Sequence, residues 1–140
     1  MTTNEDKKNI TNKKSKRIIA KKPIIKRNIH EIDATEKVSG RLATRISILL
    51  RGKNKANYQP NIDNGEVVIV TNASKMKFSG KKLEQKIYYH YSGFQGGLKQ
   101  KKAAELFEKN PSEILKRAVW NMLPKNKLRR QMFKRLKITN

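Results

Sequence analysis

The chain has 140 residues, a length that suits one domain with a terminal extension. It carries 34 Lys and Arg against 11 Asp and Glu, so its formal net charge is +23, and 36% of its residues are hydrophobic. The absence of cysteine excludes disulfide frameworks, thiolate catalysis and Cys-ligated zinc, and the excess positive charge predicts a polyanionic partner that neutralises it.

The N-terminal segment, residues 1–28, is a basic extension. Residues 1–29 carry ten Lys and Arg against two acids, arranged as basic doublets without a helical apolar stripe. We expect this extension to be disordered when free and to contact nucleic acid, because it cannot bury enough apolar surface to fold alone. A solubilising tail is the alternative, while scarce arginine disfavours a mitochondrial transit peptide. Residues 29–140 then form the folded domain.

Four short segments of this domain are predicted as strands: Ile29–Asp33, 67–70, 75–78 and Ile87–Tyr91. Residues 67–70 are a continuous β-branched run, which is typical of a central parallel strand that is buried on both faces. A helix is predicted from Ser39, because apolar residues recur from Leu42 at helical spacing and Gly52 stands where a C-terminal cap is expected. Residues 81–86 are expected to form a short helix or a turn.

After residue 97 the pattern becomes helical. One helix is predicted around residues 103–107, and a second starts at Asn110, a good N-cap followed by proline, and ends before Pro124. Apolar residues at i, i+4 and i+8 from Leu128 to Leu136 predict a last helix whose other faces are basic. The alternation favours an α/β fold with a mostly parallel sheet of about four strands and a basic helical C-terminal end.

Motifs for catalysis and metal binding are missing from the sequence. Neither His30 nor His90 has a His or carboxylate at metal-ligand spacing on one helix, and Ser79-Gly80-Lys81 fails the phosphate-loop pattern because Lys75 stands where glycine is needed. We expect no enzyme activity, no cofactor, no metal and no small-molecule substrate. Gly93-Phe94-Gln95-Gly96 matches the clamp loop of KH domains, a weaker alternative because such a loop joins two helices. No apolar run suits a membrane helix or a signal peptide, so we expect a soluble intracellular protein.

Two segments place cations beside aromatic rings. Residues 51–55 precede Tyr58, and residues 81–82 precede the aromatic strand at residues 88–91. Cations next to stackable rings suit RNA phosphates and unpaired bases. The alternative is that tyrosines of residues 88–91 pack in the core, and we expect two of these four side chains inside and two outside. Residues 116–140 carry nine Lys and Arg and no acid, which favours a polyanion-binding face there too.

Short blocks follow one another over residues 30–138, in this order: Ile32-Asp33-Ala34, Gly40-Arg41-Leu42-Ala43-Thr44, Leu50-Arg51-Gly52-Lys53, Tyr58-Gln59-Pro60, Asn72-Ala73, Ser79-Gly80-Lys81-Lys82, Tyr88-Tyr89, Ser92-Gly93, Gly96-Gly97-Leu98-Lys99 and Met122-Leu123-Pro124-Lys125-Asn126-Lys127-Leu128. In their order and spacing, these blocks resemble the bacterial-type large-subunit ribosomal protein family numbered thirteen.

The resemblance implies a three-layer α/β/α fold and a structural constituent of the large ribosomal subunit that binds large-subunit rRNA directly and supports early subunit assembly. It implies large-subunit rRNA and neighbouring large-subunit ribosomal proteins as partners, and no membrane. We expect a cytoplasmic location in the ribosome, with an organellar ribosome as the alternative. A free RNA-binding translational regulator is the alternative function, and a nucleotide-using enzyme is disfavoured because the motifs it needs are missing.

The expected RNA contacts combine the family motifs with the ring of the basic loop and the basic face of the last helix. They are Arg41, Arg51, Lys53, Lys55, Tyr58, Lys81, Lys82, Tyr89, His90, Ser92, Lys99, Lys125, Asn126, Arg129, Arg130, Lys134 and Arg135. The family usually has Arg-His where His90-Tyr91 stands and Tyr-Pro where Phe94-Gln95 stands. The segment before His30 is also longer and more basic than in the typical bacterial member.

Overall fold

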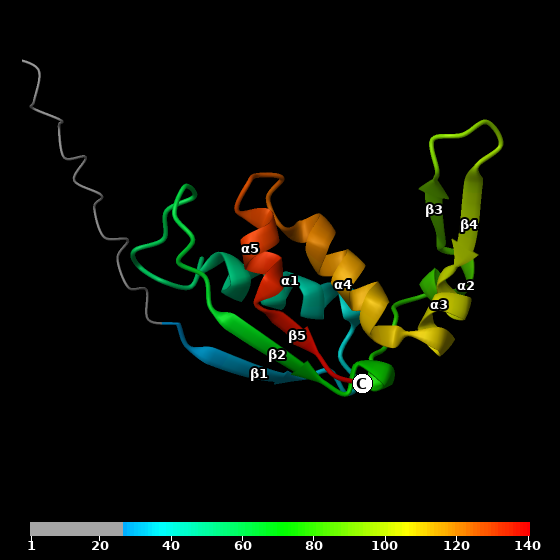
Figure 1. The fold of residues 1–140 in the computed structure, drawn as a ribbon. Coiled ribbons are helices and arrows are strands. Elements are labelled where there is room, and N and C mark those ends of the chain that lie inside the picture. Colours follow the sequence, from blue (N-terminus) through cyan, green and yellow to red (C-terminus); the bar gives the residue numbers. More distant parts are fainter. Residues whose placement is uncertain (1–26) are drawn as a thin grey trace, which may run out of the picture.

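The structure is a computed structural model that describes residues 27–140, so residues 1–26 of the extension that is expected to be disordered (1–28) lie outside the described part. Its last two residues join the folded domain, where Arg27 donates to the Gly65 carbonyl at 2.5 Å and the Asn28 amide donates to Glu66 at 3.4 Å. The centre of the domain is a parallel sheet with the strand order β1-β2-β5 (Figure 1). The strands are β1 (Ile29–Asp33), β2 (Val67–Thr71) and β5 (Leu136–Ile138). The predictions of strands at 29–33 and 67–70 are confirmed, but this sheet has three strands instead of about four.

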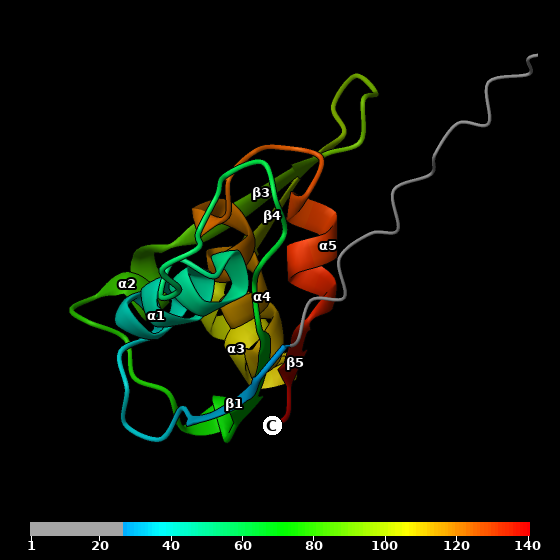
Figure 2. The same cartoon turned by 90° about the vertical axis from the view of Figure 1, so that its left-hand side faces the viewer.

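The helices lie on one face of this sheet (Figures 1 and 2). Along β2, Val68 and Val70 are fully buried, whereas Val67 and Ile69 on the other face are only half-buried. β2 is therefore central and parallel, as predicted, but the expectation that it is buried on both faces is wrong. Apart from a separate antiparallel pair of strands, the elements of residues 27–140 form this sheet and one layer of helices, where three layers were expected.

Helix α1 (Ser39–Arg51) follows the predicted spacing. Leu42, Ile46 and Leu50 are buried one turn apart, and they form the side of the helix that packs in the core. Gly52 ends the helix with a φ of +73°, and its backbone N–H donates to carbonyls of the last turn. A Cβ at this position would also lie 2.8 Å from the backbone of the loop at residue 64, so glycine is required for two reasons.

Three further helices complete the body: α3 (Ala103–Lys109), α4 (Pro111–Met122) and α5 (Arg129–Lys134). α4 packs against both α1 and α3, and it supplies Ile114, Leu115 and Val119 to the core. The predicted N-cap, Asn110, makes no capping bond to the backbone; its side-chain oxygen instead accepts the Ser112 hydroxyl at 2.7 Å. The helix nevertheless starts and ends where predicted.

The predictions for residues 75–78 and for the end of the last helix are wrong. Residues 75–78 form no strand: a short 3-10 helix, η1 (Ala73–Lys75), is followed by a single bridge from Val38 to Lys77. Leu136 continues the apolar spacing of the predicted last helix, yet α5 ends at Lys134 and Leu136 begins β5. Pairing with β2, which is remote in sequence, decides the conformation there against the local helical pattern.

A second, antiparallel sheet extends away from the body (Figure 1). This hairpin consists of β3 (Ile87–Tyr91) and β4 (Leu98–Lys102), and the short helix α2 (Lys82–Gln85) precedes it. β3 and α2 confirm the predictions for their segments, but the helical pattern expected after residue 97 begins only at Ala103. Because the hairpin lies outside the main sheet, most of its side chains remain in solvent.

Candidate nucleic-acid interface

The register of the hairpin sorts its side chains onto two faces. Tyr88 pairs with Lys101 and His90 pairs with Lys99, so these four side chains share one face, the cationic face. The opposite face, here called the apolar face, carries Ile87, Tyr89, Tyr91 and Leu98 together with the polar Gln100 and Lys102. The two faces of one small sheet therefore differ in chemistry.

Only one of the residues 88–91 is shielded from solvent. Tyr88 is half-buried against the core, whereas Tyr89 and Tyr91 are 59% and 62% exposed and His90 is also exposed. The expectation of two inside and two outside is therefore wrong, because no helix of the described residues covers the rest of the hairpin. Burial raises the pKa of the Tyr88 hydroxyl above its ordinary value of 10.0.

No acidic side chain neutralises the hairpin from within. Residues 85–104 contain four lysines and no Asp or Glu. The predicted site residues His90, Ser92 and Lys99 are all exposed there, and so is Lys101, which the sequence interpretation missed because its segment was taken as helical. Lys82, at the foot of the hairpin, is exposed as well. The hairpin therefore presents cations that the chain itself leaves in water.

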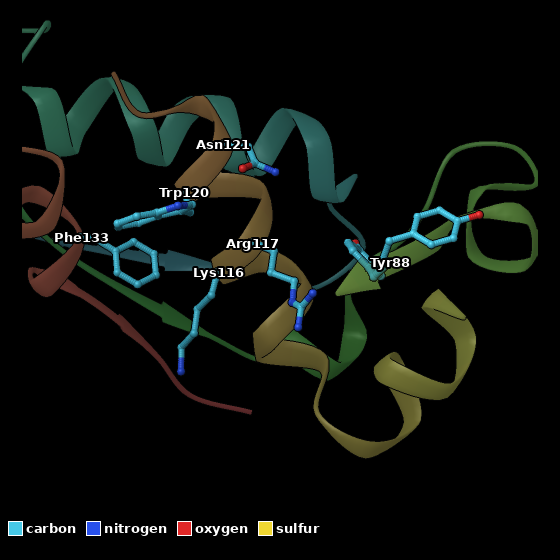
Figure 3. A pocket seen from close by; sticks show the side chains of 7 residues that line it. Tyr88, Lys116, Arg117, Trp120, Asn121 and Phe133 are labelled. Atoms are coloured by element: carbon cyan, nitrogen blue, oxygen red, sulfur yellow. The ribbon is translucent and has the colours of Figure 1, made fainter. Parts of the chain in front are cut away.

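A groove of about 540 Å³ lies where the hairpin meets α4 and α5 (Figure 3). Its lining residues are Tyr88, Tyr89, Lys116, Arg117, Trp120, Asn121 and Phe133. The guanidinium of Arg129, a predicted site residue, lies 4.2 Å from the centre of the Trp120 ring, and its Nε donates to the Trp120 carbonyl at 2.9 Å. Arg129 is thus held against Trp120 by the protein and does not line the groove itself. The sequence interpretation named none of Lys116, Arg117 and Trp120 as site residues.

The other exposed members of the predicted set are spread over the surface. They are Arg41, Lys53, Lys81, Lys125, Asn126, Arg130 and Lys134. They come from α1, the loop that follows it, the turn before α2 and the C-terminal region, so the predicted set is distributed over several elements. Arg45, one turn along α1 from Arg41, is exposed too and was not included in the set.

Other predicted residues are engaged inside the protein. Arg51 donates to the Tyr58 hydroxyl at 3.0 Å. Arg135 binds both carboxylate oxygens of Asp63, at 2.5 and 2.6 Å, and also donates to the Leu50 carbonyl at 2.9 Å. The fork of Arg135 therefore ties the C-terminal region to the end of α1 and to the loop before β2. The geometry gives Arg135 a structural role, and its contact with RNA stays a prediction.

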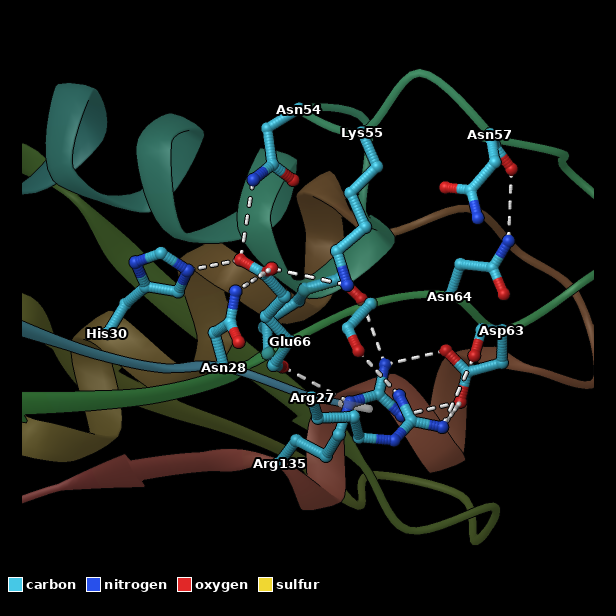
Figure 4. Close-up of polar contacts among 12 residues, drawn as sticks. Arg27, Asn28, His30, Asn54, Lys55, Asn57, Asp63, Asn64, Glu66 and Arg135 are labelled. Carbon is cyan, nitrogen blue, oxygen red and sulfur yellow. Dashed lines mark hydrogen bonds and ion pairs between the residues drawn. The ribbon is translucent and has the colours of Figure 1, made fainter. Parts of the chain in front are cut away.

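The sequence interpretation also missed a buried carboxylate (Figure 4). The Glu66 side chain is 2% exposed; it pairs with Lys55 Nζ at 3.2 Å and accepts hydrogen bonds from His30, from Asn54 at 3.3 Å and from Asn28 at 3.4 Å. Burial acts to raise the pKa of Glu66, but the bonds from Lys55, His30 and Asn54 leave it below the ordinary value of 4.5. In the sequence, the one sign of this buried carboxylate is that Glu66 directly precedes the β-branched run of residues 67–70.

The arrangement suits binding rather than chemistry. Residues 27–140 contain no group of three His, Asp or Glu side chains that could hold a metal ion. In the same part of the chain, no helix is long and apolar enough to cross a membrane. The exposed cations, the neighbouring aromatic rings and the groove can instead hold a polyanion that has flat, stackable groups.

Comparison with known proteins identifies the family. The chain matches the family described as ribosomal protein L13 over residues 27–139. It is 55% identical over 120 residues to large ribosomal subunit protein uL13 of Pelobacter propionicus, and the aligned residues cover 86% of this chain and 84% of that protein. The uL13 proteins of Geobacter sulfurreducens (48% over 120 residues, 86% and 84% covered) and Thermotoga petrophila (51% over 114 residues, 81% and 76% covered) are also similar. The resemblance seen in the motif blocks is confirmed, and the chain belongs to the ribosomal protein L13 family, a family of structural proteins rather than enzymes.

Proposed function

We propose that this chain is a structural constituent of the large ribosomal subunit, that it binds large-subunit rRNA directly, and that it supports early assembly of the subunit. The observation that carries the proposal is the hairpin, whose His90, Lys99 and Lys101 share an exposed face in strands without an acid. The names of the relatives, large ribosomal subunit proteins, favour rRNA as the polyanion and ribosomal proteins as neighbours. The role in early assembly rests on the family alone.

The mechanism is electrostatic. Each lysine that meets a phosphate releases condensed counterions, so affinity falls steeply as salt rises. Such contacts position the protein on folded RNA without reading base edges. A hairpin that stands away from the body reaches phosphates that a flat surface cannot, and its exposed rings, Tyr89 and Tyr91, add stacking on unpaired bases.

A double charge reversal tests the proposal. Lys99→Glu with Lys101→Glu replaces two attractive contacts by two repulsive ones, so we expect the affinity for transcribed large-subunit rRNA to fall by about tenfold or more in a filter-binding assay. The dependence of affinity on salt should become shallower in the same variant.

The matched control is Lys75→Glu with Lys137→Glu, which changes the net charge equally. Lys75 lies on η1, and Lys137 lies on the outer face of β5, because Leu136 and Ile138 pack against the core. This control should lose much less affinity than the hairpin variant. Equal losses in the two variants would mean that only total charge matters, and the hairpin would not be the contact.

Sedimentation separates the proposal from a regulator that acts away from the ribosome. In a sucrose gradient at about half-molar salt, a constituent held by many shielded contacts should travel with the large subunit at close to one copy per particle. Release to the top of the gradient would contradict the structural role.

A further inference from the structure

We infer that the groove between the hairpin and α4 is a subsite for a short unpaired stretch of RNA, with a phosphate held in its middle and bases against aromatic rings at its two ends. The inference rests on the proposed function and adds to it a place and a chemistry. Lys116 and Arg117 lie along the middle of the groove, with Trp120 and Phe133 at one end and Tyr88 at the other (Figure 3).

The periodicity of α4 creates this arrangement. Lys116 and Trp120 are one helical turn apart, and so are Arg117 and Asn121, so one side of the helix offers two cations, a ring and an amide to the groove. Tyr88 comes from β3 and closes the other end. The site therefore exists only because the foot of the hairpin, at Tyr88, lies beside Arg117 of α4.

The aromatic end of the groove is fixed before any ligand arrives. The rings of Trp120 and Phe133 meet edge to face with centroids 5.1 Å apart, and the Arg129 guanidinium covers the Trp120 ring at 4.2 Å. The Arg129 Nε bond to the Trp120 carbonyl, 2.9 Å long, holds the cation there. Because these side chains are already ordered, the binding of a base at this end costs the protein little conformational entropy.

The charge of the groove favours a phosphate. Lys116 is exposed, and within residues 27–140 it has no hydrogen-bond or ion-pair partner. Arg117 donates to Glu113 at 2.5 and 2.9 Å and lies 5.1 Å from the centre of the Tyr88 ring, and no carboxylate of the described residues lines the groove. Net positive charge remains for an anion.

A neighbouring hollow continues the same chemistry. It is lined by Tyr88, His90, Lys99, Lys101 and Arg117, and it shares Tyr88 and Arg117 with the groove. An RNA strand that leaves the groove past Tyr88 therefore meets the cationic face of the hairpin. An apolar protein segment would leave Lys116 buried without a partner, which is costly, so the observations favour RNA over a protein side chain.

The chain carries a single tryptophan, and it lies in this groove. The chain also has four tyrosines, so the emission is excited at a wavelength that tyrosine does not absorb, where all of it comes from Trp120. We expect a short unstructured adenosine- and uridine-containing RNA to quench Trp120 emission saturably, and more weakly as salt rises. Lys116→Gln should raise the concentration of RNA at half-quenching by about five- to tenfold, because it removes one phosphate contact. Lys75→Gln, the matched control on η1, should leave that concentration unchanged.

Two variants of Tyr88 test whether weaker quenching comes from a lost contact with RNA or from a change of packing in the protein. Tyr88→Phe keeps the ring at the far end and should quench as the natural chain does, whereas Tyr88→Ala removes it and should weaken quenching. Binding of large-subunit rRNA on filters with no change in Trp120 emission, or equal effects of Lys116→Gln and Lys75→Gln, would overturn the groove and leave the proposed function intact. Quenching by an apolar peptide but not by RNA would also overturn it. Absence of any RNA binding would overturn both.

Discussion

The loop after α1 and the β3–β4 hairpin both carry cations beside aromatic rings, yet the two regions use them differently. In the loop, Lys55 meets the buried carboxylate of Glu66 at 3.2 Å. In the hairpin, Lys99 and Lys101 are exposed in strands that hold no acid. The basic blocks of the two regions look alike in sequence. Whether their lysines are paired or free depends on carboxylates that lie outside the blocks. A cation count therefore overestimates the surface available to RNA.

The two regions differ in whether their charges are removed from water and whether the protein itself pairs them. Glu66 is taken out of water, so it is stable as an ion only while Lys55, His30 and the amides supply its hydrogen bonds. Removing one member of such a cluster leaves the others poorly solvated. The hairpin lysines keep their hydration in the free protein, so changing them costs the fold little.

The largest expected effect comes from breaking the buried cluster. Glu66→Ala leaves Lys55 and the amides without their acceptor, and we expect the free energy of unfolding to fall by about 3 kcal/mol. Urea denaturation of the full chain measures it. Glu66→Gln keeps a carbonyl acceptor and the volume of the side chain, so its loss should be smaller. A loss under about 0.5 kcal/mol for Glu66→Ala would make the two regions equivalent.

A second prediction uses pH. The pKa of Glu66 lies below 4.5, so the folded state binds this proton more weakly than the unfolded state does. Its contribution to stability is fully present above pH 4.5 and is lost as the pH falls through the lower, folded pKa. Unfolding free energies measured against pH should therefore fall more steeply on the acid side in the natural chain than in Glu66→Gln.

Asp33 contributes equally to both proteins in that comparison. The backbone N–H of Thr35 and the side chain of Asn72 lower the pKa of Asp33 to about 2, so it also loses stabilisation in acid. The difference between the two curves isolates Glu66. Identical acid slopes in the two proteins would contradict the assigned role of the carboxylate.

The smallest expected effect concerns the apolar face of the hairpin. Tyr91 and Leu98 are a cross-strand pair and are 62% and 53% exposed. Changing both to serine should alter the free energy of unfolding by less than about 0.5 kcal/mol, because little apolar area leaves or enters water. Val70→Ser in the core, by contrast, should be strongly destabilising. A large effect of the hairpin pair would show that this face packs on the body.

Much of the fold follows from local pattern. The strand at 29–33, the helix from Ser39 and its glycine cap are all in the sequence, because spacing and capping act within a few residues. The strand β4 is not, since Leu98–Lys102 is polar and becomes a strand only by pairing across the turn with β3. The strand β5 is missed for the same reason, as its partner β2 is remote.

The candidate site likewise has residues that a local sequence pattern predicts and residues that depend on contacts between remote segments. Exposed cations such as Lys99 could be predicted, because charge runs and motif blocks are local. The internal engagement of Arg135 could not, because its partner Asp63 lies 72 residues away. The groove at Trp120 was equally out of reach, since its walls come from β3, α4 and α5.

The ion pair between Arg135 and Asp63, which are 72 residues apart, has a consequence for the order in which parts of the chain fold. The central sheet closes only when segments as far apart as Asp63 and Arg135 have met, and such non-local closure is slow. The hairpin needs only a short turn between residues 91 and 98, so it can form much sooner. A lone hairpin is only marginally stable in water, so it becomes lasting when α2 and α3 pack against β4. The hairpin and the central sheet therefore belong to different stages of folding, the first set by neighbouring residues and the second by remote ones.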